Sequence, residues 1–519
     1  MSSGLPVSAR ADVVIIGSGI GGSTLAYALR GTGRSVLVLE RGPYLPREAD
    51  NWNSTAVFAD LKYRTADRWI DRKGREFRPE MQYYVGGNSK FYGGVLWRLR
   101  ASDFGRSSHA DGESAPWPVS YEDLEPYYSL AESIYGVRGS IGADPTEPNH
   151  SAPYKHVALE HEPPMARLAS KLAGQGLHPF QPPIAVGYGD GGPCIRCRTC
   201  DGFPCQIDAK GDAEVRCLRP ALKAPNVVLQ TDTMATRVIT THDGDHAAGV
   251  EVIRGGQRSV VGAGTVVVAC GAVNSAALLL HSATPVHPNG LGNSSGLVGR
   301  NYMQHTCTLL MAVAPLRRNA TKFQKTLAVN DYYYGEPGYS YPMGGLQTIG
   351  KLDAPMLAAG ARRLVPRFLL SQLVCRSTDW LVMSEDIAHP DNRVELTSDG
   401  RIRLAWRPTN LDSHRRLVRR AKTALRRAGY PLIFHHMLGV ESNPHQCGTV
   451  RFGRESATSV LDASCRSHDV SNLYVIDASF FPSSAAVNPA LTIAAQALRV
   501  ADVAFDASLL PPRRSASDR

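Results

Sequence analysis

Residues 11–22 read ADVVIIGSGIGG, an apolar run followed at once by a cluster of glycines. The run at 11–16 predicts a buried strand, because Val and Ile favour extended backbone. Residues 23–30 are typical of a helix, and residues 35–40 predict a second strand. This order of strand, helix and strand predicts an α/β fold that opens on a parallel, doubly wound sheet.

The glycines at 17, 19 and 22 have the spacing G-x-G-x-x-G between the first strand and the first helix. Gly17 permits a tight turn, Gly19 lets the backbone approach a pyrophosphate, and Gly22 allows the helix to pack closely on the strand. Glu40 ends the second strand, where its carboxylate can bond to ribose hydroxyls, and we include the adjacent Arg41 in the site. The pattern predicts a bound adenine dinucleotide without separating FAD from NAD.

The chain has 519 residues, of which 43% are hydrophobic, so we expect two domains or one two-lobed unit. Its net charge of +10 raises the question of nucleic acid or an acidic membrane as partner. We expect neither, because the excess is mostly scattered Arg and the densest group falls on one predicted helix without interleaved aromatics. That group is Arg415, Arg416, Arg419, Arg420, Arg426 and Arg427.

The first residues, MSSGLPVSARADVVII, do not show the pattern of a signal peptide. No apolar run approaches the roughly 18 residues that a membrane helix needs. The ten cysteines do not resemble a secreted disulfide framework. We therefore expect a cytoplasmic protein.

The rest of the chain predicts two kinds of region. A helical pattern at 117–137 is followed by a surface excursion over 139–186. An antiparallel meander with a final buried strand is predicted at 227–229, 235–240, 249–253 and 266–269. Residues 306–437, which include a long basic helix near 411–429, differ in composition and predict a cap domain, and residues 472–504 predict a strand, a turn and an apolar helix.

Several segments then resemble one family. They are NPHQCGTVRFG at 443–453, NLYVIDASFFP at 472–482, AVNPALTI at 486–493, VGGNSK at 85–90, VVACGAVNS at 267–275 and NSSGLVGRNYMQH at 293–305. Together they resemble the glucose-methanol-choline (GMC) oxidoreductases, FAD enzymes that oxidise alcohols. The resemblance implies a Rossmann-like FAD domain with an interleaved α+β cap built on an antiparallel sheet. We expect the FAD domain at 1–100, 205–305 and 455–507, the cap at 101–204 and 306–454, and a disordered tail at 508–519.

The resemblance also implies the catalytic residues. His445 stands where the family carries its catalytic His, and an imidazole suits proton transfer near neutral pH. The alternative is a structural histidine, of which the chain has many. Asn488 occupies the family's second position and cannot act as a base, so we expect it to orient the substrate oxygen.

The resemblance also implies contacts to the cofactor. Pro489 suits the first turn of a helix whose N-terminus, with Ala490 and Thr492, would face the flavin. Phe91 stands where some relatives carry a histidine that links to flavin, so we expect non-covalent FAD. The remaining expected cofactor contacts are Gly86, Gly87, Ser89, Ala235, Ala269, Gly271 and Asp477.

Residues 320–331 resemble the bacterial pyranose and glycoside oxidase branch of the family. We therefore expect oxidation of a secondary alcohol of a sugar or glycoside to a ketone, with Gln304 and His305 as substrate contacts. Oxygen or another acceptor would reoxidise the flavin. The alternatives are another alcohol (polyol, aliphatic or sterol), a flavin-bearing hydroxynitrile-type lyase, and an electron-transfer protein.

The last alternative depends on a cysteine cluster. Its members are Cys194, Cys197, Cys200 and Cys205, with Cys217 beyond. Thiolates at short spacing suit zinc or an iron–sulfur cluster as well as a local disulfide. We favour free thiols or a disulfide, because the last spacing does not match the bacterial ferredoxin pattern.

Overall fold

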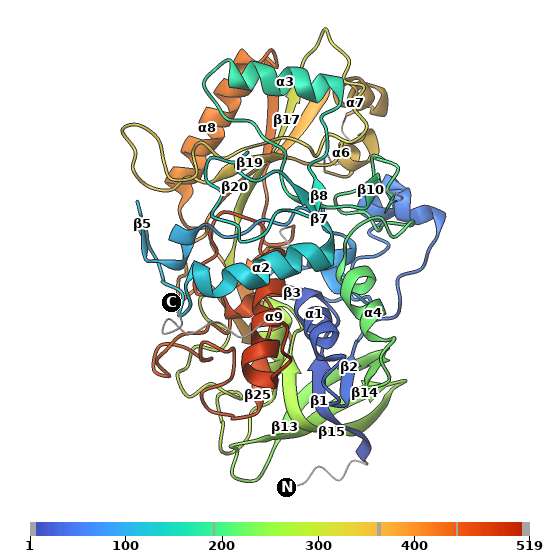
Figure 1. The fold of residues 1–519 in the computed structure, drawn as a ribbon, viewed down its shortest axis with the longest axis vertical. Coiled ribbons are helices and arrows are strands. Elements are labelled where there is room, and N and C mark those ends of the chain that lie inside the picture. Colours follow the sequence, from blue (N-terminus) through green and yellow to red (C-terminus); the bar gives the residue numbers. More distant parts are fainter. Residues whose placement is uncertain (1–6, 190–191, 361–364, 443–444, 511–519) are drawn as a thin grey trace.

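A computed structural model describes residues 7–189, 192–360, 365–442 and 445–510. Figure 1 shows an elongated molecule with a seven-stranded sheet in its lower half and a five-stranded sheet in its upper half. The predicted α/β architecture with an antiparallel cap sheet is confirmed.

The lower sheet has the order β12-β2-β1-β15-β14-β13, with β25 also paired to β15. β1 lies parallel to β2 and β15, which confirms the doubly wound opening. β13, β14 and β15 form an antiparallel meander as predicted, but β12, predicted as its first strand, pairs in parallel with β2. The strands are β1 (Val7–Ile16), β2 (Val36–Leu39), β12 (Val227–Gln230), β13 (Thr233–Thr240), β14 (Ala247–Arg254), β15 (Gln257–Val268) and β25 (Leu473–Val475).

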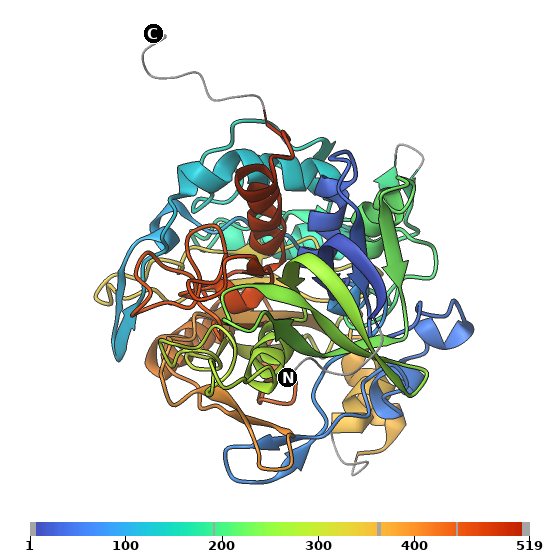
Figure 2. The same ribbon diagram turned by 90° about the horizontal axis from the view of Figure 1, so that it is seen from below.

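Helices α1 (Ile20–Leu29) and α9 (Ala490–Phe505) lie side by side against this sheet (Figures 1 and 2). Most of their buried side chains are apolar, which places the core between helix and strand. Helix α2 (Tyr121–Tyr135), at the position predicted from residues 117–137, packs on α9. Two further helices of this half are α4 (Arg219–Ala221) and α5 (Ala272–His281).

The upper sheet has the order β18-β19-β20-β17-β23. Helices α3 (Pro163–Ala173) and α8 (Leu411–Arg427) share a core with it through Leu168, Trp380 and Leu417. The strands are β17 (Thr306–Val313), β18 (Ala328–Val329), β19 (Gly345–Thr348), β20 (Ser377–Ser384) and β23 (Leu432–Met437), and the flanking helices are α6 (Ala354–Gly360) and α7 (Arg367–Val374).

Helix α3 corrects one expectation. Residues 139–186 were predicted to be a surface excursion, yet Met165, Leu168 and Leu172 form one buried face within them. The spacing of three and four residues places these side chains on one side of a helix. The Pro and Gly residues around the helix hid this pattern.

A four-stranded sheet of order β21-β22-β3-β4 packs on α5 through β21. Strand β22 pairs in parallel with β3 through Arg403 with Ile70 and Leu404 with Asp71. Segments of the predicted FAD domain and of the predicted cap therefore share one sheet. The strands are β3 (Trp69–Asp71), β4 (Glu76–Phe77), β21 (Arg393–Leu396) and β22 (Ile402–Ala405).

Short strands complete the structure. They are β5 (Ser107–His109), β6 (Gly112–Ser114), β7 (Val137–Gly139), β8 (His156–Val157), β9 (Ile184–Ala185), β10 (Tyr188–Gly189), β11 (Gly192–Pro193), β16 (Met303–Gln304) and β24 (Gln446–Cys447). Within the described ranges, no helix is both long and apolar enough to cross a membrane. The predicted disordered tail, 508–519, lies outside the described residues from 511 onward.

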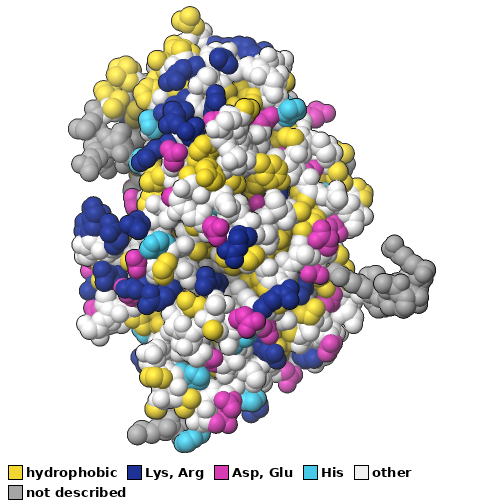
Figure 3. All heavy atoms as spheres, turned by 90° about the vertical axis from the view of Figure 1, so that its left-hand side faces the viewer, with side chains coloured by type: hydrophobic (Ala, Val, Ile, Leu, Met, Phe, Trp, Pro, Cys, Tyr) yellow, Lys and Arg dark blue, Asp and Glu magenta, His cyan; other side chains and the backbone are white. Residues whose placement is uncertain are grey.

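The basic side chains do not form one continuous surface on the face shown in Figure 3. Lys and Arg lie there in several separate groups, with Asp and Glu side chains between them. Charges of both signs mixed in this way are typical of a solvated surface.

Candidate active site

A groove of about 950 Å³ opens at the carboxyl ends of β1, β2 and β15. Ligands of open α/β sheets bind at this edge. Ten of the predicted cofactor residues line the groove, from both the N-terminal and the C-terminal parts of the chain. They are Gly17, Gly19, Glu40, Arg41, Gly87, Ser89, Ala235, Ala269, Gly271 and Asp477.

The glycines of the fingerprint differ in what surrounds them. Gly17 has a φ of +105°, and a Cβ there would lie 2.4 Å from the carbonyl oxygen of Ala269. A Cβ on Gly22 would lie 2.0 Å from the carbonyl oxygen of Gly17. Gly19, at the N-cap of α1, has no atom within 4 Å of its Cβ position. Gly17 and Gly22 thus serve the turn and the packing, and the backbone at Gly19 is open to a phosphate.

A hydrogen-bond cluster around Glu40 fixes the end of β2. Oε2 of Glu40 accepts bonds from the backbone N–H of Ser18 at 3.1 Å and from its hydroxyl at 2.5 Å. Oε1 accepts the N–H of Gly42 at 2.9 Å. Burial raises the pKa of Glu40, and these bonds oppose that rise. The carboxylate is therefore held at the groove wall, in the position predicted for a ribose contact.

Asp477 has a similar anchoring role in the C-terminal part. Oδ2 accepts the N–H of Gly271 at 3.0 Å and the hydroxyl of Ser275 at 2.5 Å, and Oδ1 accepts the N–H of Ser479 at 2.8 Å. Burial raises the pKa of Asp477. The residue thus joins the N-terminus of α5 to the segment after β25 and lines the groove between them.

The loop at 86–90 also lines the groove, through residues 87–89. The N–H of Gly86 donates to the hydroxyl of Ser18 at 3.0 Å, and Ser89 donates to the carbonyl of Gly86. Lys90, which is buried, bonds to Asp212 at 3.0 Å and to Glu214 at 2.6 Å. These carboxylates raise the pKa of Lys90 against the opposing effect of burial. A charged cluster therefore holds the loop in place.

Ala490 and Thr492, two predicted cofactor contacts at the start of α9, are not among the residues that line the groove. Pro489 lines the groove and is the N-cap of α9, so the helix begins one residue later than predicted, at Ala490. The hydroxyl of Thr492 is buried and bonds to that of Tyr128 at 2.8 Å. Thr492 therefore anchors α9 to α2.

His445 and Asn488 lie together beside Gln446 and Pro489, which line the groove. Nδ2 of Asn488 lies 3.3 Å from Nε2 of His445. The Nδ1 atoms of His445 and His305 are 3.1 Å apart, and Nε2 of His305 bonds to the carbonyl of Ser484 at 3.0 Å. The structure thus brings together the predicted base, its predicted partner and a second imidazole.

Both imidazoles are neutral at physiological pH. Burial, together with the neighbouring His305, lowers the pKa of His445 to about 3. Burial also lowers the pKa of His305. A neutral imidazole has one unprotonated ring nitrogen, so His445 can accept a proton.

The two residues predicted to contact substrate are buried in the protein. Gln304 accepts the hydroxyl of Tyr302 at 2.7 Å and donates to the carbonyl of Gly439 at 3.3 Å. His305 has an exposed fraction of 1% and stands behind His445. This arrangement gives His305 a place next to the predicted base.

The cysteine cluster is a set of free thiols in the structure. Burial raises the pKa of both Cys200 and Cys217 to about 11, so these two thiols are protonated at neutral pH. Cys217 lies apart from the others, against Thr24 and Tyr135. Among the residues that the structure describes, no group of three or more His, Cys, Asp or Glu side chains could hold a metal ion.

Sequence reasoning missed Ser18, Gln347 and Trp97. Ser18 lies inside the fingerprint, and its hydroxyl could have been noticed there as a partner for Glu40. Gln347 donates to Oδ1 of Asn488 at 3.3 Å, and Trp97 donates to Oε1 of Gln347 at 3.2 Å. No local motif marks these two residues.

Comparisons with known proteins agree with this geometry. Two models described as GMC oxidoreductase match residues 180–307 and 388–497, and one described as FAD dependent oxidoreductase matches residues 12–102. The chain is 34% identical over 520 residues to 6'''-hydroxyparomomycin C oxidase of Streptomyces lividus, covering 94% of this chain and 90% of that protein. The chain belongs to the GMC oxidoreductase family.

One further sequence and one solved structure are similar to this GMC oxidoreductase. It is 32% identical to paromamine 6'-oxidase of Streptomyces fradiae, over 94% of this chain and 90% of that protein. The solved structure of pyridoxine 4-oxidase from Mesorbium loti has a TM-score of 0.65 at 19% identity, covering 95% of this chain and 99% of that one. That likeness shows the shared fold.

The protein is an FAD-dependent oxidoreductase acting on alcohol CH–OH groups, and its residues fit the cofactor. Gly19 and Gly271 stand at the N-caps of α1 and α5, and neither has an atom within 4 Å of its Cβ position. Helix N-termini with an open approach suit phosphate groups. Glu40 and Asp477 would bond to hydroxyl groups of the cofactor along the same groove.

Proposed function

We propose that this GMC oxidoreductase oxidises an alcohol carbon of a sugar or glycoside, with His445 as the general base. The observation that carries the proposal is the pair of His445 Nε2 and Asn488 Nδ2, 3.3 Å apart beside the cofactor groove. An alcohol carbon releases hydride as its hydroxyl proton leaves, so a base must reach that hydroxyl. Bound FAD supplies the acceptor for the hydride.

The pair gives each side chain one task. The lone pair on Nε2 of His445 accepts the hydroxyl proton, and the N–H of Asn488 donates to the same substrate oxygen. That donation orients the oxygen and stabilises its growing negative charge. Both side chains are next in sequence to residues that line the cofactor groove, Gln446 and Pro489.

The relatives support a sugar as substrate. Two of them are named as oxidases of 6'''-hydroxyparomomycin C and of paromamine. Position 6 of a hexopyranose is its exocyclic alcohol, so an aldehyde product is proposed beside the ketone expected for a ring carbon. Substrate would enter between the FAD-binding part, proposed as 1–100, 205–305 and 455–507, and the cap, proposed as 101–204 and 306–454.

The ten free thiols support a reducing compartment such as the cytoplasm.

The test is anaerobic mixing of the FAD-loaded enzyme with paromamine, free hexoses and methyl glycosides, following the flavin absorbance band. We expect bleaching with at least one sugar, and mass spectrometry of the product separates aldehyde from ketone. His445→Ala should slow the reduction by about 10²–10⁴-fold. His468→Ala is the matched control and should reduce at the normal rate, because His468 bonds to Ser459 away from the groove.

Three results would contradict the proposal. Reduction at full rate in His445→Ala would exclude this residue as the base. An inert flavin with cleavage of a cyanohydrin would favour the lyase alternative. Bleaching by aliphatic alcohols alone would exclude a sugar. Repeating turnover with oxygen and with a quinone identifies the acceptor.

A further inference from the structure

A chain of side-chain hydrogen bonds passes through both nitrogens of His445. From one end it runs from the indole of Trp97 to Gln347, then to Asn488 and His445. It continues through His305 to the backbone carbonyl of Ser484. The two end groups decide which atom of every member carries a proton.

The indole end sets one side of His445. An indole N–H only donates, so the Gln347 atom 3.2 Å from it must be the carbonyl oxygen. The amide nitrogen of Gln347 therefore donates to Oδ1 of Asn488 at 3.3 Å. The amide nitrogen of Asn488, Nδ2, is then a donor and faces Nε2 of His445 at 3.3 Å. Nε2 must accept, so it holds the lone pair.

The carbonyl end sets the other side independently. A carbonyl oxygen only accepts, so Nε2 of His305, 3.0 Å from the oxygen of Ser484, carries a proton. Because burial lowers the pKa of His305, its ring is neutral and its Nδ1 holds a lone pair. Nδ1 of His445, 3.1 Å away, must then donate. Both ends assign the same tautomer to His445.

Each end of the chain is itself fixed. Ala485 adopts a φ of 54°, a left-handed conformation that residues with a Cβ keep only where the surroundings impose it. Its N–H bonds to Glu385 at 3.2 Å, which holds the peptide that presents the Ser484 carbonyl.

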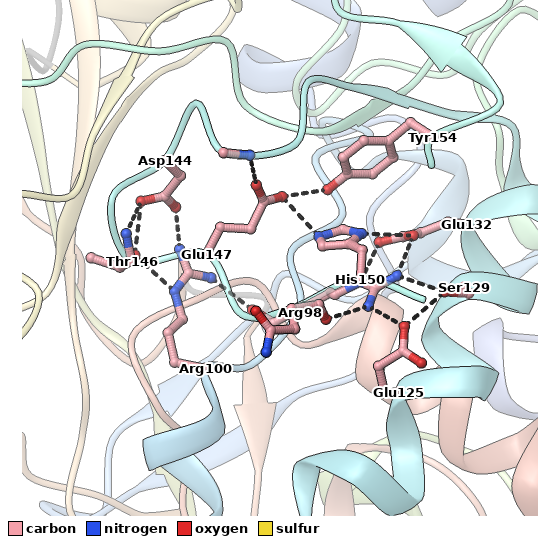
Figure 4. A network of polar contacts seen from close by, with 12 residues as sticks. Arg98, Arg100, Glu125, Ser129, Glu132, Asp144, Thr146, Glu147, His150 and Tyr154 are labelled. Carbon is pink, nitrogen blue, oxygen red and sulfur yellow. Dashed lines mark hydrogen bonds and ion pairs between the residues drawn. The ribbon is translucent and has the colours of Figure 1, made fainter. Parts of the chain in front are cut away.

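Trp97, at the opposite end, is buried. Arg98 and Arg100, which follow it in the chain, belong to the polar network in Figure 4. The guanidinium of Arg100 stacks on the ring of Trp97 at 5.2 Å and pairs with Asp144. Arg98, next in the chain, pairs with Glu125 and Glu132. The backbone that carries the indole is thus held by buried ion pairs.

We propose that His305 and Gln347 are positioning residues that hold His445 with its proton on Nδ1 and its lone pair on Nε2. This proposal rests on the proposed function, in which His445 is the base. In the reaction, the substrate O–H bond breaks, its proton joins the lone pair on Nε2, and its electron pair becomes the second bond of the new C=O group. The C–H bond breaks at the same carbon, and its electron pair leaves with the hydrogen as a hydride for the acceptor that bound FAD would supply. His445 then carries protons on both nitrogens, and its Nδ1–H still donates to His305.

The first test reads the tautomer without turnover. The FAD-loaded enzyme is labelled with ¹⁵N-histidine, and long-range proton–nitrogen spectra distinguish the two neutral tautomers. The His445 signals are those that disappear in His445→Gln. We expect the tautomer protonated at Nδ1. A signal from the tautomer protonated at Nε2 would overturn the proposal.

The second test measures flavin reduction by the sugar that bleaches the flavin fastest. His305→Leu and Gln347→Leu should each lower the rate constant by roughly 10–100-fold, with substrate affinity nearly unchanged. His305→Gln should restore most of the rate, because its amide can donate to Ser484 and accept from His445. His414→Leu is the matched control: this imidazole is equally buried, bonds to Thr308 and Ser384, and should not affect the rate.

The outcomes separate the two proposals. Full activity in His445→Ala overturns the base and with it the proposed function. Loss of activity in His445→Ala, with normal rates in His305→Leu and Gln347→Leu, overturns only the positioning roles. An equal loss in His414→Leu would show that packing alone explains the effect. If His305→Leu does not fold, the wild-type spectrum and Gln347→Leu still decide.

Discussion

The hydroxyl of Ser18 donates to Oε2 of Glu40 at 2.5 Å and accepts the N–H of Gly86 at 3.0 Å. One side chain thus connects the fingerprint turn, the acid at the end of β2 and the loop at 86–90. The three parts lie far apart in the sequence, and Ser18 is where they meet.

Ser18→Ala should weaken FAD binding. A hydrogen bond to a charged group contributes about 1.5–3 kcal/mol, so the dissociation constant should rise roughly 10–100-fold. Fluorescence titration of the apoprotein with FAD measures it. Ser282→Ala is the control, because Ser282 is equally buried and bonds to the N–H of Val238 and the carbonyl of Leu278 instead of to Glu40 and Gly86. Unchanged FAD affinity in Ser18→Ala would contradict the role assigned to this hydroxyl.

Two glycine substitutions should have different effects, one on stability and the other on FAD binding. Gly17→Ala places a Cβ 2.4 Å from a carbonyl oxygen at a φ of +105°, and should lower the free energy of unfolding by at least about 2 kcal/mol. Gly19→Ala meets no protein atom within 4 Å and should change the stability of the apoprotein by less than about 1 kcal/mol. It should nevertheless weaken FAD binding, because its Cβ enters the space proposed for the pyrophosphate.

Urea unfolding of both apoproteins, followed by FAD titration, checks this contrast. A destabilised Gly19→Ala that binds FAD normally would show that Gly19 serves the fold and not the cofactor.

The rate of flavin reduction should depend little on pH between 8 and 5. The base must be unprotonated, and with the pKa of His445 lowered to about 3 it stays so throughout this range. The rate should fall only as the pH drops toward that pKa, because protonation removes the lone pair on Nε2. Stopped-flow reduction by a neutral sugar gives the profile. A decline centred near the ordinary histidine pKa of about 6.5 would mean that His445 is not buried as the structure has it.

Local patterns sufficed for the cofactor side of the fold. The spacing of Gly17, Gly19 and Gly22 between a strand and a helix determines where a dinucleotide can approach, and the structure places Glu40 at the groove as predicted. His445 and Asn488 were predicted from motifs near the C-terminus, and they lie together. Each of these signals is contained in a short segment.

The rest depends on contacts between distant residues. Gln347 lies 141 positions from Asn488 and 250 from Trp97, so no spacing rule connects them. The sequence predicts His305 as a substrate contact but does not reveal that its Nδ1 lies 3.1 Å from Nδ1 of His445. The pairing of β22 with β3 also joins distant segments. Each of these strands is too short to show a periodic pattern in the sequence.

That shared sheet limits how the protein can be re-engineered. Exchanging the cap for that of a relative at the predicted boundaries would replace β22 beside β3 by a segment of another sequence, at the rim of the cofactor groove, where Trp69 and Ile402 stand. New specificities are therefore more accessible through point changes and loop grafts than through transplantation of a whole lobe.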